Sequence, residues 1–340
     1  MSTGPNPGVL PVTRMAKIGL WGASGSGKTT YLASLYVAVT QSQGRWNIVG
    51  VDQESVDFLT EKTDALTLER RFPKKTEGIQ NLSWTVMGTT EQTVTKGWRK
   101  RVETVPLHFQ LDMIDAAGGL FKGTTEDDTD GDDIDIDFDD AKNESGGDAE
   151  QLIDQLADCD GIIYLYDPLR ENRNGDEFRH FQWALQNIVF RAARNGTIDG
   201  MHLPHYLAVC ITKLDDPKVF HTAYKRGYLV PEPSDPFLFP RVREDKVEAL
   251  FRELGNLSPT RGAVMVHDAI RASFHESRVR YFATSAIGFY VGQSATRFRA
   301  ANFQNVVPHP NQRDEFTIRG DIHPINVLEP LLWLGRMTNR

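Results

Sequence analysis

The sequence predicts an α/β protein with a doubly wound, mostly parallel sheet of six strands and helices on both faces. Two observations support this fold class. Short apolar runs alternate along the chain with segments whose apolar residues recur three or four positions apart, as in a helix. Two of the runs, 161–166 and 206–211, are apolar throughout, which is typical of parallel strands buried on both faces. Alternation of this kind favours a parallel sheet crossed by helices.

Each predicted strand has its own pattern. Residues 17–21 form a short apolar run that ends in a glycine cluster. At 82–86 and 107–113 apolar residues alternate with polar ones, which indicates strands with one polar face. The remaining strands are expected at 161–166, 206–211 and 279–284.

Helical spacing of apolar residues fills the intervals between these strands. In 31–41, for example, the apolar residues stand at positions 32, 35, 36 and 39. The predicted helices cover 31–41, 53–71, 148–158, 177–194, 243–254, 266–277 and, to close the chain, 326–337. Pro330 is compatible with the last helix only near its first turn.

The chain is expected to form a single domain over 16–340, behind a flexible, proline-containing arm at 1–15. Stretches that break the strand–helix rhythm are expected to be insertions, at about 42–71, 119–147, 216–242 and 287–318. The first of these could instead hold an extra strand and helix. The stretch 119–147 is acidic and rich in glycine, so we expect it to be disordered.

The composition narrows the class of protein. Two cysteines, Cys159 and Cys210, cannot build a disulfide framework, and no Cys/His spacing matches a zinc site. There is no apolar run of about 20 residues and no signal-like N-terminal segment, so we expect a reduced, cytoplasmic protein with no membrane partner. The net charge of −8 is uneven: residues 126–148 hold twelve acidic residues and one lysine, or −11, which leaves +3 for the rest.

A glycine-rich motif follows the first predicted strand. Residues 22–29 fit G-x-x-x-x-G-K-[ST] and are followed by a predicted helix, which is the context of a phosphate loop. Its glycines let backbone N–H groups turn inward, Lys28 supplies charge at the β- and γ-phosphates, and the Thr29 hydroxyl can bind magnesium. The predicted phosphate site comprises Gly22, Ala23, Ser24, Gly25, Ser26, Gly27, Lys28, Thr29 and Thr30. The alternative is a glycine-rich turn without a ligand.

The residues after two later strands predict which base is bound. Thr212, Lys213 and Asp215 form [NT]-K-x-D at the end of 206–211. A carboxylate there can accept from both N1–H and the exocyclic amine of guanine, a donor pair that adenine lacks. The Lys213 stem can pack along the purine. Ser285 and Ala286 follow the last strand, where small residues let a backbone N–H approach guanine O6. The alternative is a surface Lys–Asp turn.

A third motif, Asp115-Ala-Ala-Gly118, follows the strand at 107–113. Asp115 can hold magnesium through water, and the Gly118 amide can contact the γ-phosphate. The alternative is an aspartate that merely ends a strand.

With these motifs in this order, the chain resembles the Ras-like, translation-factor-related GTPases of the P-loop NTPase class, whose fold is the G domain. The resemblance covers about 16–340. It implies a switch that binds GTP or GDP with Mg²⁺, hydrolyses GTP and acts with a protein effector or activating partner. It also implies a magnesium-binding threonine in a first switch loop. Thr76 is our candidate, and Thr89, Thr90 and Thr93 are alternatives if the register differs.

More narrowly, three phrases are similar to the prokaryotic double-GTPase group, which is associated with bacterial multi-gene conflict systems. They are Gly-Ser-Gly-Lys-Thr-Thr-Tyr-Leu at 25–32, Arg-Phe-Pro-Lys-Lys-Thr at 71–76 and Pro-Ile-Asn-Val-Leu-Glu-Pro-Leu-Leu-Trp at 324–333.

One departure from the family concerns catalysis. Gly119 stands where Ras-like enzymes have a water-orienting glutamine, which implies slow intrinsic turnover. The residues expected to act on GTP are Lys28, Thr76 and Gly118, with Arg71 as a candidate arginine finger. The alternative for Arg71 is a solvated helix end beside Glu69. Two other functions stay open: a nucleotide-binding scaffold that barely hydrolyses and recruits partners, and an ATP-using phosphate-loop protein.

The acidic stretch 126–148 follows the third motif directly. It begins like a calcium-binding loop but lacks the terminal glutamate and flanking helices, so calcium binding is not predicted. We interpret the stretch 126–148 either as a solvated insertion or as a contact for a basic surface of a partner protein. Its charge argues against nucleic acid as a direct partner.

Overall fold

The computed structural model describes residues 15–74, 79–96, 99–116, 149–258, 260–293, 295–310 and 315–338. The described chain is a mixed α/β protein centred on one sheet in the order β2-β3-β4-β1-β5-β6-β9. The strands are β1 (Ala16–Gly22), β2 (Trp46–Gly50), β3 (Ile79–Lys96), β4 (Arg99–Ala116), β5 (Gly161–Tyr166), β6 (Tyr206–Ile211) and β9 (Val279–Ala283).

The sheet is mostly parallel, as predicted. β4, β1, β5, β6 and β9 run parallel to one another, while β3 is antiparallel to both β2 and β4. The prediction of six strands was wrong by one, because β2 adds a seventh. β2 and the helix that follows it lie within the predicted insertion at 42–71, which therefore contains an extra strand and helix.

β3 and β4 are much longer than their predicted segments. They pair along their whole length, from Ile79 opposite Ala116 to Lys96 opposite Arg99. β2 pairs with β3 only as far as Gly88 of β3, and β1 pairs with β4 only from Phe109 of β4 onward. The predicted segments 82–86 and 107–113 contribute buried core residues such as Trp84 and Phe109, whereas residues 101–104 of β4 are exposed.

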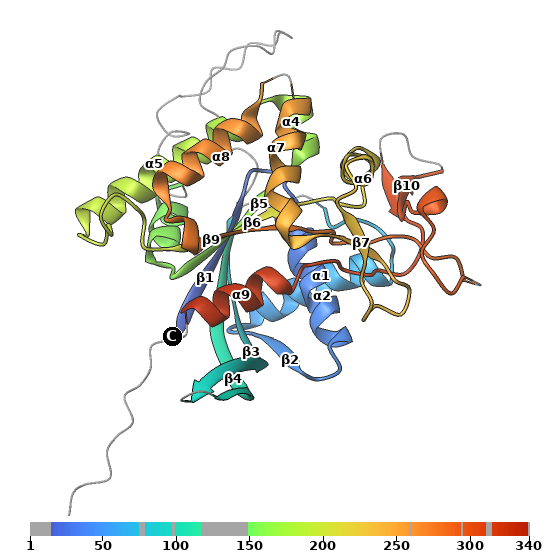
Figure 1. The fold of residues 1–340 in the computed structure, drawn as a ribbon, viewed down its shortest axis with the longest axis horizontal. Coiled ribbons are helices and arrows are strands. Elements are labelled where there is room, and N and C mark those ends of the chain that lie inside the picture. The colour runs from blue at the N-terminus through green and yellow to red at the C-terminus, as the bar shows by residue number, and fades with distance from the viewer. Residues whose placement is uncertain are drawn as a thin grey trace, which may run out of the picture.

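Helices cover both faces of the sheet (Figure 1). One face packs against α1 (Lys28–Gln41), α2 (Gln53–Thr67) and α9 (Glu329–Thr338). The other packs against residues 149–158, α5 (Glu177–Arg194), α6 (Pro217–Lys225), α7 (Val247–Leu257) and α8 (Gly262–Ser273). The doubly wound prediction is confirmed in this respect.

Two helices escaped prediction, α4 (Pro168–Asn174) and α6. Each begins with an aspartate whose side chain accepts from the helix backbone, followed by proline in the first turn. Several predicted helices have different bounds: α2 ends at 67 rather than 71, α7 spans 247–257 rather than 243–254, and α8 spans 262–273 rather than 266–277, with η2 (Glu276–Arg278) after it. Pro330 lies in the first turn of α9, as required.

The later irregular stretches are small folded additions. Besides α6, 216–242 contains the hairpin of β7 (Leu229–Pro231) and β8 (Pro240–Val242), and η1 (Glu244–Lys246) leads into α7. The stretch 287–318 contains η3 (Ala300–Asn302) and the hairpin of β10 (Val306–Pro308) and β11 (Phe316–Ile318). A small cluster that includes Ala33, Leu66 and Ile318 packs this hairpin against α1 and α2.

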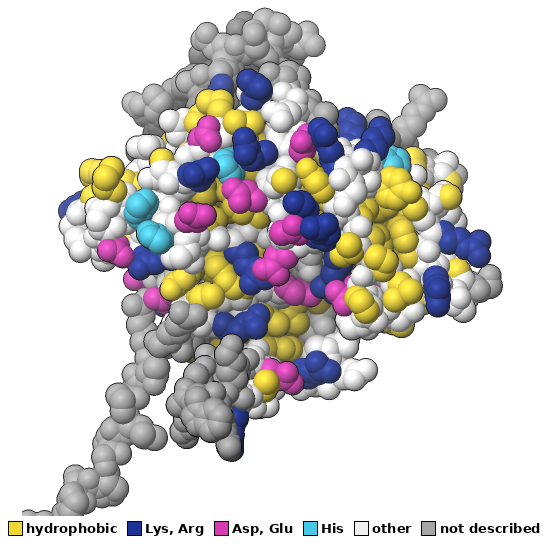
Figure 2. Space-filling view, viewed as in Figure 1, with side chains coloured by type: hydrophobic (Ala, Val, Ile, Leu, Met, Phe, Trp, Pro, Cys, Tyr) yellow, Lys and Arg dark blue, Asp and Glu magenta, His cyan; other side chains and the backbone are white. Residues whose placement is uncertain are grey.

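Residues 1–14, and the stretch 119–147 expected to be disordered, lie outside the described residues. Over the face drawn in Figure 2, acidic and basic side chains are interspersed and form no large field of one sign. None of the described helices is long and apolar enough to cross a membrane.

Candidate nucleotide-binding site

The glycine-rich motif forms the turn between β1 and α1. Gly25 and Gly27 have φ values of 75° and 96°, a left-handed conformation that favours glycine. Gly22 is constrained by contact instead, because a Cβ there would lie 2.5 Å from Ser26 Oγ and 2.9 Å from the Leu165 carbonyl oxygen. The turn is closed by a hydrogen bond from the Ser26 N–H to the Ala23 carbonyl at 3.0 Å.

Lys28 and Ser26 present polar atoms at this turn. The Lys28 ammonium donates to the carbonyl oxygens of Gly22 and Ala23 at 3.1 and 3.5 Å, so it lies across the loop. Ser26 is fully buried, and its Oγ has no hydrogen-bond partner within the described residues. Thr29 and Thr30 stand in the first turn of α1, where backbone N–H groups and the helix dipole favour an anion.

The [NT]-K-x-D motif is fixed between two neighbouring strand ends. The N–H and hydroxyl of Thr212 both donate to the Tyr166 carbonyl at the end of β5, at 2.9 and 3.0 Å. The Leu214 N–H donates to the Thr284 carbonyl after β9. Lys213 between them has φ 60°, and its ammonium pairs with Asp167.

Asp215 is a buried carboxylate at the back of this loop. The Ser285 hydroxyl donates to its Oδ1 at 2.5 Å, and the Gly288 N–H donates to the Ser285 hydroxyl at 2.7 Å. Burial raises the pKa of Asp215 to about 6, even though the Ser285 bond lowers it. The Ser285 N–H donates to the Ile325 carbonyl, so the backbone donor expected near the base is left to Ala286.

A single cavity of about 580 Å³ joins the glycine turn after β1 to the loops at 212–215 and 284–286, which are the candidate base-reading loops. From the predicted site residues it is lined by Gly25, Ser26, Gly27, Thr30, Thr212, Lys213, Asp215 and Ala286. The structure therefore brings together motifs that are almost 190 residues apart in the chain. The remaining residues of these motifs adjoin the lining residues in the chain without lining the cavity themselves: Gly22, Ala23, Ser24, Lys28, Thr29 and Ser285.

Much of the cavity wall was not predicted from the sequence. The additional residues are Tyr31, Phe72, Leu169, Arg173, Asp216, Pro217, Thr284, Ile287, Gln304, Val306, Pro308 and Phe316. Leu169 and Arg173 come from α4, for which the Asp-Pro pair at 167–168 is the available sequence signal. Val306, Pro308 and Phe316 come from the β10–β11 hairpin, and no local pattern indicates that it folds over this cavity.

The third motif is only partly described. Asp115 is next to last in β4, and Met113, two residues earlier, pairs with Leu20 of β1. The backbone of Asp115 thus reaches the same edge of the sheet at which β1 ends and the glycine turn begins. Gly118, Gly119 and the switch candidate Thr76 lie outside the described residues.

The alternative switch threonines lie too far along β3 to serve. Ile79 pairs with Ala116 beside Asp115, whereas Thr89 pairs with Pro106, ten residues farther along the strand. That is a distance of about 33 Å at roughly 3.3 Å per residue. Thr90 and Thr93 lie farther still.

Arg71 does not line the cavity. Its Nε forms an ion pair with Glu69, and its backbone bridges to Thr317 of β11. The preceding carbonyl, that of Arg70, accepts from the Ile318 N–H at 2.9 Å and the Thr317 hydroxyl at 3.1 Å. The segment that leads to Thr76 is therefore held by the β10–β11 hairpin.

The proposed magnesium ligands Thr29, Thr76 and Asp115 carry hydroxyl and carboxylate oxygens, which Mg²⁺ prefers. The described residues contain no cluster of three His, Cys, Asp or Glu side chains that could hold another metal.

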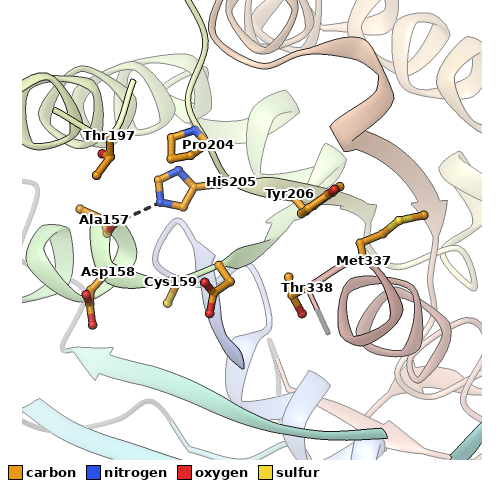
Figure 3. A pocket seen from close by; sticks show the side chains of 10 residues that line it. Ala157, Asp158, Cys159, Thr197, Pro204, His205, Tyr206, Met337 and Thr338 are labelled. Atoms are coloured by element: carbon orange, nitrogen blue, oxygen red, sulfur yellow. Dashed lines mark hydrogen bonds between the residues drawn. The ribbon is translucent and has the colours of Figure 1, made fainter. Parts of the chain in front are cut away.

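A second cavity, of about 330 Å³, lies where the chain enters β5 and β6, and none of the nucleotide motifs contributes to it (Figure 3). The His205 ring lies beside it, with Nε2 3.3 Å from the Ala157 carbonyl. Burial lowers the pKa of His205 and raises that of the Cys159 thiol, so both are neutral near pH 7. This cavity offers neither a charged imidazole nor a thiolate.

No protein-family model and no curated protein sequence matches the chain. Solved structures do align with it, among them the following two. The crystal structure of Sup35 complexed with GDP aligns over 86% of this chain and 43% of that chain, with 12% identity and a TM-score of 0.29. The SRb–GTP/SRX complex of the signal recognition particle receptor from Chaetomium thermophilum aligns over 84% of this chain and 95% of that chain, with 13% identity and a TM-score of 0.34. This chain thus spans less than half of the Sup35 chain.

Proposed function

We propose that this protein is a guanine-nucleotide-binding switch with a P-loop G domain, which binds GTP with Mg²⁺ and hydrolyses it slowly to GDP. The supporting observation is the single cavity that connects the glycine-rich turn after β1 to the buried Asp215. A nucleotide needs both ends of such a cavity, because its phosphates and its base are bound by different chemistry. The domain extends from about residue 16 to 340, with additions between its core elements.

At the phosphate end, the glycine turn offers backbone N–H groups and Lys28 supplies positive charge. Thr29, Asp115 and Thr76 would hold the magnesium ion, which when bound neutralises charge on the β- and γ-phosphates. The Gly118 N–H would contact the γ-phosphate. The buried Ser26 hydroxyl, which has no partner in the described chain, supplies a further polar atom at this end.

At the base end, the Asp215 carboxylate would accept two hydrogen bonds from guanine, and the Lys213 stem would cover a face of the ring. The carboxylate is well placed for this, because it is buried and Ser285 fixes one oxygen. The Ala286 N–H would face O6.

Turnover is slow in this proposal because Gly119 has no side chain with which to orient water. A protein partner that supplies this group would accelerate hydrolysis. The acidic stretch 126–148 is the candidate contact for a basic partner surface, and deletion of 126–146 should preserve GTP binding while changing the response to that partner. The ligands remain GTP and GDP, with no direct nucleic acid or membrane partner.

The nucleotide assignment is tested by comparing labelled GTP and ATP for binding to the wild type and to Asp215→Asn. We expect GTP to bind much more tightly than ATP and the variant to lose that preference. Equal affinity for the two nucleotides, unchanged by the substitution, would support the ATP-using alternative.

Hydrolysis is tested by magnesium-dependent phosphate release in a single turnover, with and without the native partner. Slow release that the partner accelerates is the expected result. Binding without release under either condition would favour the non-hydrolysing scaffold, which Gly119 already makes the second candidate. The phrases shared with the double-GTPase group support a role in a bacterial multi-gene conflict system, and the neighbouring genes test that role.

A further inference from the structure

Asp167 is a fully buried carboxylate directly after β5, next to the base-reading loop. Its Oδ2 pairs with the Lys213 ammonium, and its Oδ1 accepts from the Leu169 N–H at 2.9 Å. The second contact caps α4. One carboxylate thus connects two walls of the cavity, since Lys213 lines one and α4 contributes Leu169 and Arg173 to the other.

Within the described residues, Lys213 is the basic side chain that pairs with Asp167. The nearby Arg170 is engaged by Asp176 and Glu177. A buried carboxylate without a cation is costly, so the fold holds the Lys213 ammonium in this position. Lys213 remains one-third exposed and is one of the residues that line the cavity.

The consequence concerns the lysine stem. A free lysine side chain samples many rotamers, and ordering it on ligand binding costs conformational entropy. Here the backbone is fixed by the Thr212 and Leu214 hydrogen bonds, and the ammonium is fixed by Asp167. Both ends of the Lys213 side chain are therefore ordered before any ligand binds.

We propose that Asp167 is a positioning residue for purine binding: by holding the Lys213 ammonium, it orders the Lys213 stem as the apolar wall on which the base packs. The inference rests on the proposed guanine-nucleotide function and adds a residue outside the nucleotide motifs that itself does not touch the base. Asp215 selects guanine, so Asp167 controls how tightly a purine binds and leaves the choice of purine unchanged.

The test is Asp167→Asn, which keeps an oxygen to cap α4 and removes the charge that holds Lys213. We expect the Kd for GTP and for GDP to rise about tenfold, as for loss of one charge-assisted hydrogen bond. The ratio of GTP to ATP affinity should not change. Asp52→Asn is the matched control, because Asp52 caps α2 by accepting from the Ser55 N–H at 2.7 Å and does not line the cavity.

A double-mutant cycle with Lys213→Met separates positioning from a merely structural effect. Lys213→Met alone should weaken binding and lower the melting temperature, because Asp167 is left buried without its cation. Adding Asp167→Asn should restore the melting temperature and leave the Kd at the Lys213→Met value. The proposal is overturned if Asp167→Asn leaves the wild-type Kd unchanged, or if it weakens binding equally in both backgrounds. Failure of the underlying function looks different, because the wild type would then bind no guanine nucleotide.

Discussion

The Ser285 hydroxyl donates to Asp215 Oδ1, and both side chains are buried. Ser285→Ala leaves that carboxylate oxygen without its donor, and we expect the Kd for GTP to rise about tenfold. Nucleotide titration checks this. Ser258→Ala is the matched control, because its hydroxyl donates to the buried Glu171 at 3.1 Å, away from the cavity. An equal loss in both variants would mean that the effect is general destabilisation.

The pH dependence of GTP affinity follows from Asp215. In the proposed function its carboxylate form accepts hydrogen bonds from guanine, and burial raises its pKa to about 6. Affinity should therefore fall as the pH drops below about 6, approaching tenfold per pH unit. Measurement of Kd between pH 5 and pH 8 tests this, and Asp215→Asn should abolish the slope. The folding stability of the ligand-free protein depends on pH in the opposite direction. Because the pKa of Asp215 is raised in the folded state, its contribution to stability declines as pH rises from about 4 to about 6.

The phosphate turn should not tolerate a methyl group at Gly22. A Cβ would lie 2.9 Å from the Leu165 carbonyl oxygen, which belongs to a fully buried strand and cannot move aside. We expect Gly22→Ala to abolish measurable nucleotide binding. Gly292→Ala is the control, because the nearest atom to its Cβ would be 3.7 Å away, an ordinary contact. Retained binding in Gly22→Ala would show that the turn can shift.

Arg71→Ala tests the arginine-finger hypothesis. Because the Arg71 guanidinium pairs with Glu69 at the surface, we expect the single-turnover rate to stay within about twofold of wild type. Arg70→Ala, which removes a hydrogen bond to the Arg319 carbonyl, serves for comparison. A loss of about 10³-fold confined to Arg71→Ala would instead identify it as the finger.

Glu177 should make stability depend on pH. Burial raises its pKa to about 7, although hydrogen bonds from Tyr164 and Arg170 lower it in part. Its contribution to stability is therefore greatest at acidic pH and is lost as pH rises toward 7. Glu177→Gln should reduce the change in unfolding free energy between pH 5 and pH 8 by on the order of 1–3 kcal/mol. Urea denaturation at each pH measures it, and parallel curves for variant and wild type would contradict the prediction.

The sequence predicted the elements whose signal is local. The bounds of α5, β5 and β6 match the predicted 177–194, 161–166 and 206–211. β2 was predicted only as the alternative to an insertion at 42–71, because it has five residues and its burial depends on pairing with β3, which is distant in the chain. α4 is short, and its cap aspartate is informative mainly once the preceding strand is known.

The same distinction applies to the site. The glycine turn and the loop at Asp215 are each contiguous in sequence, so their chemistry could be predicted. Their convergence on one cavity depends on β1, β5 and β6 being neighbours in the sheet. That strand order follows from the doubly wound fold and from neither motif alone. The contribution of α4 and of the β10–β11 hairpin comes from packing between distant segments, for which single-sequence patterns carry no signal.

One short strap, residues 325–327, connects the segment at Ser285 to Tyr31 of the cavity wall. Ile325 exchanges backbone hydrogen bonds with Ser285, and the Val327 carbonyl accepts from the Tyr31 hydroxyl of α1 at 2.6 Å. These residues leave the ribosome after every strand of the sheet has been made. The segments that carry Ser285 and Tyr31 can therefore be joined through this strap only after the whole sheet has been synthesised.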